Sequence, residues 1–168
     1  MNTIVLWLYR IVTRWLPESR AFGFKAILLR FAGAKIGNNV RIYSSAGFLG
    51  TGGLEFGDDV HIGPSALFSA TAPAVIKVGS HVDVGPGVVV TTGTHAIDPS
   101  GLHIGGRGET HSVLIGDGCW IGARVVLLPG VELPKNTLVA AGAVVTKSVS
   151  DSHCLVAGVP ATVKKHYR

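Results

Sequence analysis

Residues 115–150 read IGDGCWIGARVVLLPGVELPKNTLVAAGAVVTKSVS, and an aliphatic residue begins each of the six hexads in this stretch. These aliphatic residues are Ile115, Ile121, Leu127, Leu133, Val139 and Val145. Two positions before the next hexad stands a second, mostly small residue: Cys119, Val125, Val131, Thr137 and Ala143. Residues two apart on a strand point to the same side, so both positions face inward. The intervening glycine, asparagine, proline and aspartate residues favour turns.

The same hexad recurs upstream, as IGNNVR from residue 36, FGDDVH from 56, IGPSAL from 62, VGSHVD from 78 and VGPGVV from 84. The pattern predicts short strands and turns with three sides per coil of about 18 residues, stacked in about five coils roughly 4.8 Å apart. The register is late after Phe48 and again after Phe68, where we expect bulges at the corners. After Val90 the next aliphatic residue is due at position 96 but comes at Ile115, so nineteen residues are inserted (115 − 96).

The composition restricts the class of protein. Apolar residues make up 47% of the 168 residues and charged residues 15%, which excludes disorder. No apolar run reaches the roughly 18 residues that a membrane span needs, and we identify no signal-peptide cleavage site. Cys119 and Cys154 do not form a disulfide framework, so a reducing cytoplasm is the expected compartment. The net charge of +5 favours anionic partners, but no nucleic-acid-binding motif is present and we expect no nucleic-acid partner.

The hexad pattern resembles that of the hexapeptide-repeat acyltransferases, over about residues 36–165. The resemblance implies an all-β fold, a left-handed parallel β-helix of about five coils with one extruded loop. It also implies a homotrimer and acetyl-CoA as the acyl donor, with no metal. We divide the chain into a helical N-terminal segment (1–35), a β-helix (36–150) with an extruded loop (96–114) and a C-terminal tail (151–168).

The stretch GPGVVVTTGTHAIDP, residues 85–99, resembles sugar O-acetyltransferases of the maltose and galactoside type, in which a histidine at the root of the loop is the catalytic base. That histidine falls on His95. Imidazole suits the role because its pKa lies near neutrality. Asp98 and Glu109 are the nearest acids that could orient the imidazole or bind the acceptor. Gly63 stands where these enzymes carry an acceptor-binding asparagine, so we expect a different acceptor.

The family resemblance also implies residues for the donor. IGDGCWIGA suggests that Trp120 borders the acyl-CoA groove, and the C-terminal stretch suggests close backbone approach to pantetheine at Ala123, Ala141 and Gly142. Thr146, Lys147 and Lys165 would meet the nucleotide phosphates. Thr162 departs from the basic residue usual in the family. Cys119 takes an inward position and is read as a small core residue.

Residues 1–34 lack the repeat. MNTIVLWLYRIVTRWLPESR predicts a helix that ends before Pro17, with Ile4, Leu8, Ile11, Val12 and Trp15 near one stripe. AFGFKAILLRFAG predicts a second helix ending at Gly33. The pair either caps the open end of the β-helix or lies on a membrane surface at its inner face.

The expected activity is transfer of acetyl to a sugar hydroxyl in surface polysaccharide or glycolipid synthesis, with His95 as the base. Two alternatives remain open: an N-acetyltransferase acting on a nucleotide-linked amino sugar, and a non-catalytic β-solenoid subunit. A zinc site of the γ-class carbonic anhydrase type would need His61, His81 and His95 to converge.

Overall fold

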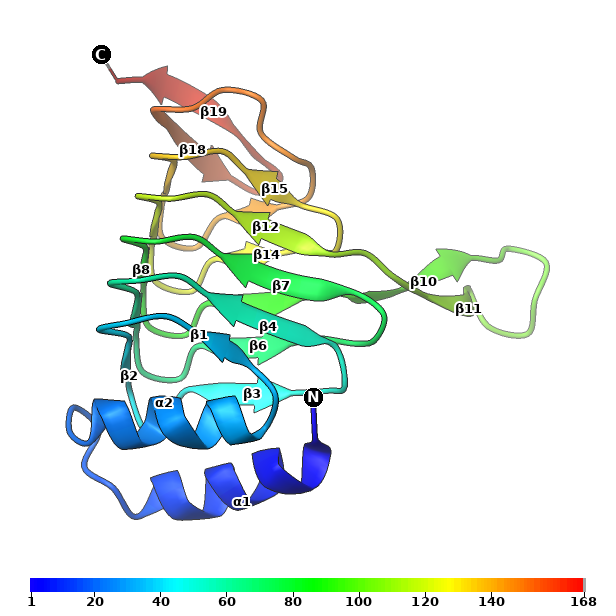
Figure 1. The fold of residues 1–168 in the computed structure, drawn as a ribbon. Coiled ribbons are helices and arrows are strands. Elements are labelled where there is room, and N and C mark those ends of the chain that lie inside the picture. The colour runs from blue at the N-terminus through cyan, green and yellow to red at the C-terminus, as the bar shows by residue number, and fades with distance from the viewer. Residues whose placement is uncertain (168) are drawn as a thin grey trace.

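The computed structural model describes residues 1–167, and the chain visits three parallel sheets in turn (Figure 1). Sheet A has the order β1 (Lys35–Ile36), β4 (Gly53–Phe56), β7 (Val75–Val78), β12 (Val113–Ile115) and β15 (Glu132–Leu133). Sheet C has the order β3 (Gly47–Leu49), β6 (Leu67–Ser69), β9 (Val89–Thr91), β14 (Val126–Leu127) and β17 (Val144–Val145). Sheet B begins with β2 (Arg41–Ile42), β5 (His61–Ile62), β8 (Asp83–Val84), β13 (Trp120–Ile121) and β16 (Leu138–Val139).

Each coil takes one strand from each sheet, so the five complete coils form a triangular prism. Followed upward in Figure 1, the chain passes from the front sheet to the left and then to the back, which is a left-handed winding. The predicted left-handed parallel β-helix is therefore confirmed. We name its edges the A–B, B–C and C–A corners, after the sheets that each turn connects.

The two inward positions of each hexad form the core. Ile121, Leu127, Val139 and the small residues Val125 and Val131 are fully buried. Every coil also donates backbone hydrogen bonds to its neighbour, as from Trp120 N to Thr137 O (3.0 Å). Each coil thus satisfies the backbone of the next, and stability is built up from nearest-neighbour contacts.

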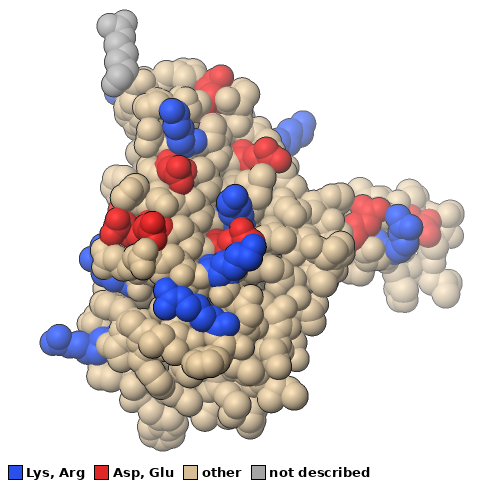
Figure 2. Space-filling view, in the orientation of Figure 1, with Lys and Arg blue, Asp and Glu red and all other residues tan. Residues whose placement is uncertain are grey.

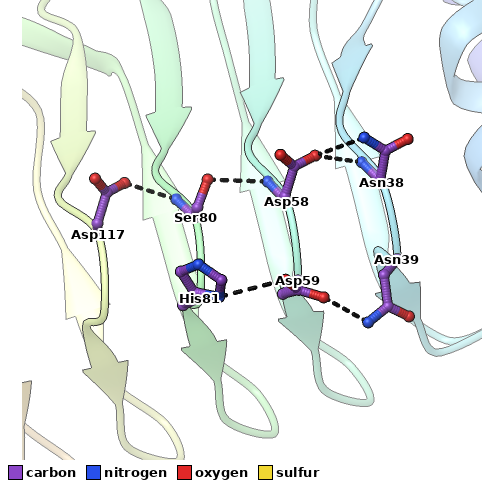
Figure 3. Close-up of polar contacts among 7 residues, drawn as sticks. All are labelled: Asn38, Asn39, Asp58, Asp59, Ser80, His81 and Asp117. Atoms are coloured by element: carbon purple, nitrogen blue, oxygen red, sulfur yellow. Dashed lines mark hydrogen bonds and ion pairs between the residues drawn. The ribbon is translucent and has the colours of Figure 1, made fainter.

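Polar side chains support the turns of the A–B corner (Figure 3). The Asp58 carboxylate accepts hydrogen bonds from the backbone nitrogen (2.6 Å) and side-chain nitrogen (3.1 Å) of Asn38. Ser80 Oγ accepts from Asp58 N (3.1 Å), and Asp117 Oδ1 accepts from Ser80 N (2.7 Å). The residues that follow in these turns adopt the left-handed conformation, which glycine adopts freely and which Asn and Asp tolerate better than most other residues. They are Asn39, Asp59, His81, Gly118 and Asn136.

The register slips all fall at the C–A corner. The extra residues after Phe48 and Phe68 lie in the turns from Leu49 to Gly53 and from Ser69 to Val75, as predicted. The long insertion projects as one extruded loop, and it is built as an antiparallel hairpin of β10 (Gly93–Ile97) and β11 (Gly105–Thr110). The hairpin projects from the prism (Figure 1), so neither face is buried in this chain and no hydrophobic alternation marks its strands.

Two helices close the lower end of the prism, as the capping interpretation predicts (Figure 1). They are α1 (Thr3–Arg14), which Asn2 caps by accepting from Ile4 N at 3.0 Å, and α2 (Phe22–Phe31). The residues that cover the first coil are Leu6, Tyr9, Ala26 and Leu29. The predicted stripe of Ile4, Leu8, Ile11, Val12 and Trp15 faces outward, and the other side of α1, which is also apolar, meets the core.

The segment that we assigned to a C-terminal tail, 151–168, forms a hairpin within the described residues. β18 (Cys154–Gly158) extends sheet B beside β16, and β19 (Ala161–His166) folds back on it in the antiparallel direction. Cys154 and Val156 are buried because they continue the inward positions of the coils below. This hairpin lies at the upper end of the prism, where it extends sheet B (Figure 1).

Candidate active site

His95 lies in β10, close to the point where the hairpin leaves the C–A corner. It is exposed and pairs with Gly108 of β11. Its Nδ1 lies 2.9 Å from the carbonyl oxygen of Gly106. Because a carbonyl can only accept, Nδ1 carries the proton in the neutral ring, and the lone pair of Nε2 remains free. The backbone of the hairpin therefore holds the imidazole in a form that can accept a proton.

Among residues 1–167, neither acid expected to orient this ring forms a hydrogen bond or ion pair with it. The Asp98 carboxylate accepts hydrogen bonds from Ser100 Oγ (2.7 Å) and Ser100 N (3.1 Å), and these bonds lower its pKa. The carboxylate of Glu109 lies 3.6 Å from Arg107 and 3.7 Å from His111. The orienting group is the Gly106 carbonyl, which sequence reasoning missed because a backbone carbonyl has no residue type to identify it.

Trp120 opens β13 and points out of sheet B, with 59% of its surface exposed. In the neighbouring coils the residues in register with it are Asp83 and Leu138. The indole does not pack in the core of its own chain. Its exposed position is therefore compatible with the expected contact with the acyl donor. Cys119, its neighbour, is buried, and burial raises the pKa of its thiol.

The small residues expected to approach pantetheine gather at the B–C corner in two adjacent coils. Gly142 N donates to Ala123 O (2.8 Å), so the two turns stack directly. A β-carbon at Gly122 would lie 2.6 Å from the backbone nitrogen of Ala141, which leaves no room for a side chain there. Ala141 and Gly142 are exposed, and because their side chains are small or absent, the backbone is accessible at the outer surface of this corner.

The expected phosphate-binding residues are not all at that corner. Thr146 and Lys147 are exposed immediately after β17, at the C–A corner above the hairpin. Lys165 lies in β19, with its Nζ 5.5 Å from the centre of the Tyr167 ring. Thr162 is exposed in the same strand, opposite Ala157.

Within one chain, the two halves of the expected site therefore lie apart. His95 stands at the C–A corner, whereas Ala123, Ala141 and Gly142 stand at the B–C corner, across the full width of sheet C. Three apolar residues near the end of the hairpin, Ile97, Leu102 and Ile104, are strongly exposed.

His61 and His81 lie apart from His95. His61 lies on sheet B, stacked on Tyr43, and its pKa is lowered by burial and by Arg41. His81 lies at the A–B corner, 3.4 Å from Asp59 (Figure 3). The three histidines of the zinc alternative thus occupy different parts of the prism. A pocket of about 430 Å³ lies at the helical end, away from His95.

Comparisons with known proteins agree with this fold. The family profile described as bacterial transferase hexapeptide (six repeats) matches residues 112–147. The chain is 36% identical to a galactoside O-acetyltransferase of Lactococcus lactis over 113 residues, 65% of this chain and 54% of that protein. A hexapeptide-repeat acetyltransferase of Vibrio cholerae, solved with acetyl coenzyme A, superposes with a TM-score of 0.68 at 24% identity, covering 98% of this chain and 86% of that one.

The chain spans only about half the length of the Lactococcus relative. A second relative, the putative colanic acid biosynthesis acetyltransferase WcaF of Escherichia coli, matches more fully. It is 30% identical over 161 residues, which cover 96% of this chain and 80% of that protein. With the repeat and the coiled fold, this match shows that the chain belongs to the hexapeptide-repeat transferase family.

Proposed function

We propose that this protein is an acetyl-CoA-dependent O-acetyltransferase that moves an acetyl group to a sugar hydroxyl, with His95 as general base. The observation that carries the proposal is the hydrogen bond between His95 Nδ1 and Gly106 O, which leaves Nε2 free on an exposed hairpin. Nε2 removes the hydroxyl proton while the oxygen attacks the thioester carbonyl carbon. The tetrahedral intermediate then expels the coenzyme thiolate, which recovers the proton from the imidazolium.

The donor would lie along the B–C corner. Ala123, Ala141 and Gly142 let the pantetheine arm approach the backbone, and the exposed Trp120 borders it. Lys147, Lys165 and Thr146 would bind the nucleotide phosphates. Compact ammonium groups suit this role because they approach phosphate oxygens from any direction.

We further propose a homotrimer, in which the hairpin of one subunit reaches the donor corner of the next. Two observations support this assembly. His95 and the donor corner are separated by sheet C within one chain. The apolar residues of the hairpin, among them the fully exposed Leu102, would be covered by a neighbour.

The acceptor that we propose belongs to a surface polysaccharide or to a lipid-linked glycan held at a membrane, in line with the name of the WcaF relative. The position of Gly63 argues against the small-sugar acceptors, because a β-carbon there would lie 2.8 Å from Val84 O and the backbone has no space for asparagine. Asp98 and Glu109, both in the hairpin, are candidates for hydrogen bonds to acceptor hydroxyls.

The test measures coenzyme thiol release from acetyl-CoA with a panel of sugars, nucleotide sugars and lipid-linked glycans. His95→Ala should lower turnover at least about 100-fold, the usual contribution of a positioned base. His81→Asn is a matched control, because His81 is exposed at another corner and asparagine tolerates its left-handed backbone. Transfer that survives His95→Ala rules out the general base. Transfer only to nucleotide-linked amino sugars would instead indicate the N-acetyltransferase. No transfer to any acceptor would indicate the non-catalytic β-solenoid subunit.

A further inference from the structure

The helical end of the prism carries an apolar surface that the fold itself does not use. We call the apolar helical face the outward side of α1 and α2, formed by Ile4, Trp7, Ile11, Trp15, Phe24 and Phe31. Trp15 is 84% exposed, Phe31 75% and Ile4 70%. The opposite sides of the same helices already close the first coil through Leu6, Tyr9, Ala26 and Leu29.

Exposed aromatic and aliphatic side chains in such a cluster are costly in water and mark a docking surface. Figure 2 shows little charge over the lower end of the molecule, where the helices lie. Because capping needs only the inner sides of the helices, the apolar helical face is free to meet a partner.

The charges at this end are almost all positive. Residues 1–34 contain Arg10, Arg14, Arg20, Lys25 and Arg30 against one acid, Glu18, a net charge of +4 (5 − 1). The whole chain has +5, so most of its excess positive charge lies at this end. Lys25 is buried and donates to Glu18 O and Ser44 Oγ, whereas Arg10, Arg14 and Arg20 are exposed. These three arginines favour a partner that is anionic as well as apolar.

Two of these arginines stand at the border of the apolar helical face. Arg10 and Arg14 are one helical turn apart on α1, so they lie along the same edge. Both line the pocket of about 430 Å³, together with Ser45 and Glu18. The Glu18 carboxylate is engaged with Ser45 N (3.1 Å) and Ser45 Oγ (3.0 Å), and among residues 1–167 neither arginine is within ion-pair distance of an acid.

We propose that the apolar helical face binds the surface of a membrane that contains anionic lipid. Trp7 and Trp15 suit the interface between headgroups and acyl chains, and Arg10 and Arg14 would meet the lipid phosphates. The helices, of 12 and 10 residues, lie on such a surface, since no described helix is long and apolar enough to cross it.

A second copy of the chain fits this face less well. Two helical ends packed against each other would bring the exposed arginines of both copies together, and each end has only Glu18 to offset them. An anionic bilayer removes this repulsion and covers the apolar side chains at the same time. The proposal concerns where the protein binds and stands independently of the reaction proposed above.

The experiment is co-sedimentation of the full-length protein with phosphatidylcholine vesicles, with and without phosphatidylserine, at low and at high salt. Binding should require phosphatidylserine and weaken with salt, and tryptophan emission should shift to the blue as Trp7 and Trp15 leave water. Ile4→Ser/Trp15→Ser should lower the partition coefficient at least about tenfold, and Arg14→Glu at least about fivefold.

Matched controls separate this face from general charge and apolarity. Lys77→Glu makes the same charge change on sheet A, and Val159→Ser removes an exposed apolar side chain at the opposite end. Both should bind like the wild type, and circular dichroism should show every variant folded. The altered residues are exposed, so folding should survive.

Three results would overturn the proposal. The first is failure of the full-length protein to bind anionic vesicles at low salt, and the second is binding that Ile4→Ser/Trp15→Ser leaves unchanged. The third is a higher-order assembly without vesicles that the same double variant breaks, which would make the face an interface between copies. Thiol release with a water-soluble acceptor, measured in parallel, keeps these outcomes distinct from failure of the proposed reaction.

Discussion

If one active site takes His95 from one subunit and the donor corner from the next, two inactive variants should restore each other when they assemble together. The first variant, His95→Ala, lacks the base but keeps its donor corner. The second, Ala141→Trp, keeps the hairpin but places an indole on the exposed turn where we expect pantetheine to lie. Each variant alone should retain no more than about 1% of wild-type activity.

The size of the recovery follows from the arrangement of the corners. A working site needs the hairpin of an Ala141→Trp subunit beside the donor corner of a His95→Ala subunit. In a closed ring of three, every mixed trimer contains one such pair among its three junctions. Purification through both tags keeps only mixed trimers, so about one third of wild-type specific activity should return.

The assay is thiol release by protein co-expressed from two differently tagged chains and purified through both tags. Mixing the two variants after separate purification, without exchange of subunits, is the control and should return nothing. Activity in the co-expressed sample no higher than in either parent would refute the reasoning. Both halves of the site would then belong to one chain, despite their separation across sheet C.

Phe48→Ala should destabilise the protein by about 3–5 kcal/mol, because the buried ring packs on Tyr9 (5.6 Å between centroids) and Phe68 (5.7 Å) and so links the cap to the coils. Denaturant unfolding measures the loss. Phe31→Ala is the control: its side chain is exposed, so the substitution should cost under about 0.5 kcal/mol. An equally small loss for Phe48→Ala would contradict the packing. Burial, and then Arg41, lower the pKa of His61. The unfolded chain therefore binds a proton at His61 more readily than the folded chain does. As a result, the free energy of unfolding should fall as the pH drops below about 6.5. Thermal melts across this range should fall less steeply for His61→Asn than for the wild type, and equal slopes would argue against the assignment.

Several features could be predicted from the sequence because they repeat. The hexads at 115–150 determine three strands per coil, since each inward pair must be apolar in every coil for the stack to bury its core. The corner positions followed from the slips after Phe48 and Phe68, and both helices from their period and from Pro17. These are local patterns, and the same pattern gives the same local structure in each coil.

The features that depend on one contact between distant residues needed the tertiary structure. Which of the two apolar sides of α1 meets the core depends on the contact between the rings of Tyr9 and Phe48, and the period of the sequence does not contain that information. The hairpin of β10 and β11 is held by backbone hydrogen bonds with no hydrophobic pattern, and β18 joins a sheet begun about a hundred residues earlier. His95 was identifiable by resemblance, but its proton is positioned by the carbonyl of Gly106, a group that every residue possesses and only the fold brings within 2.9 Å.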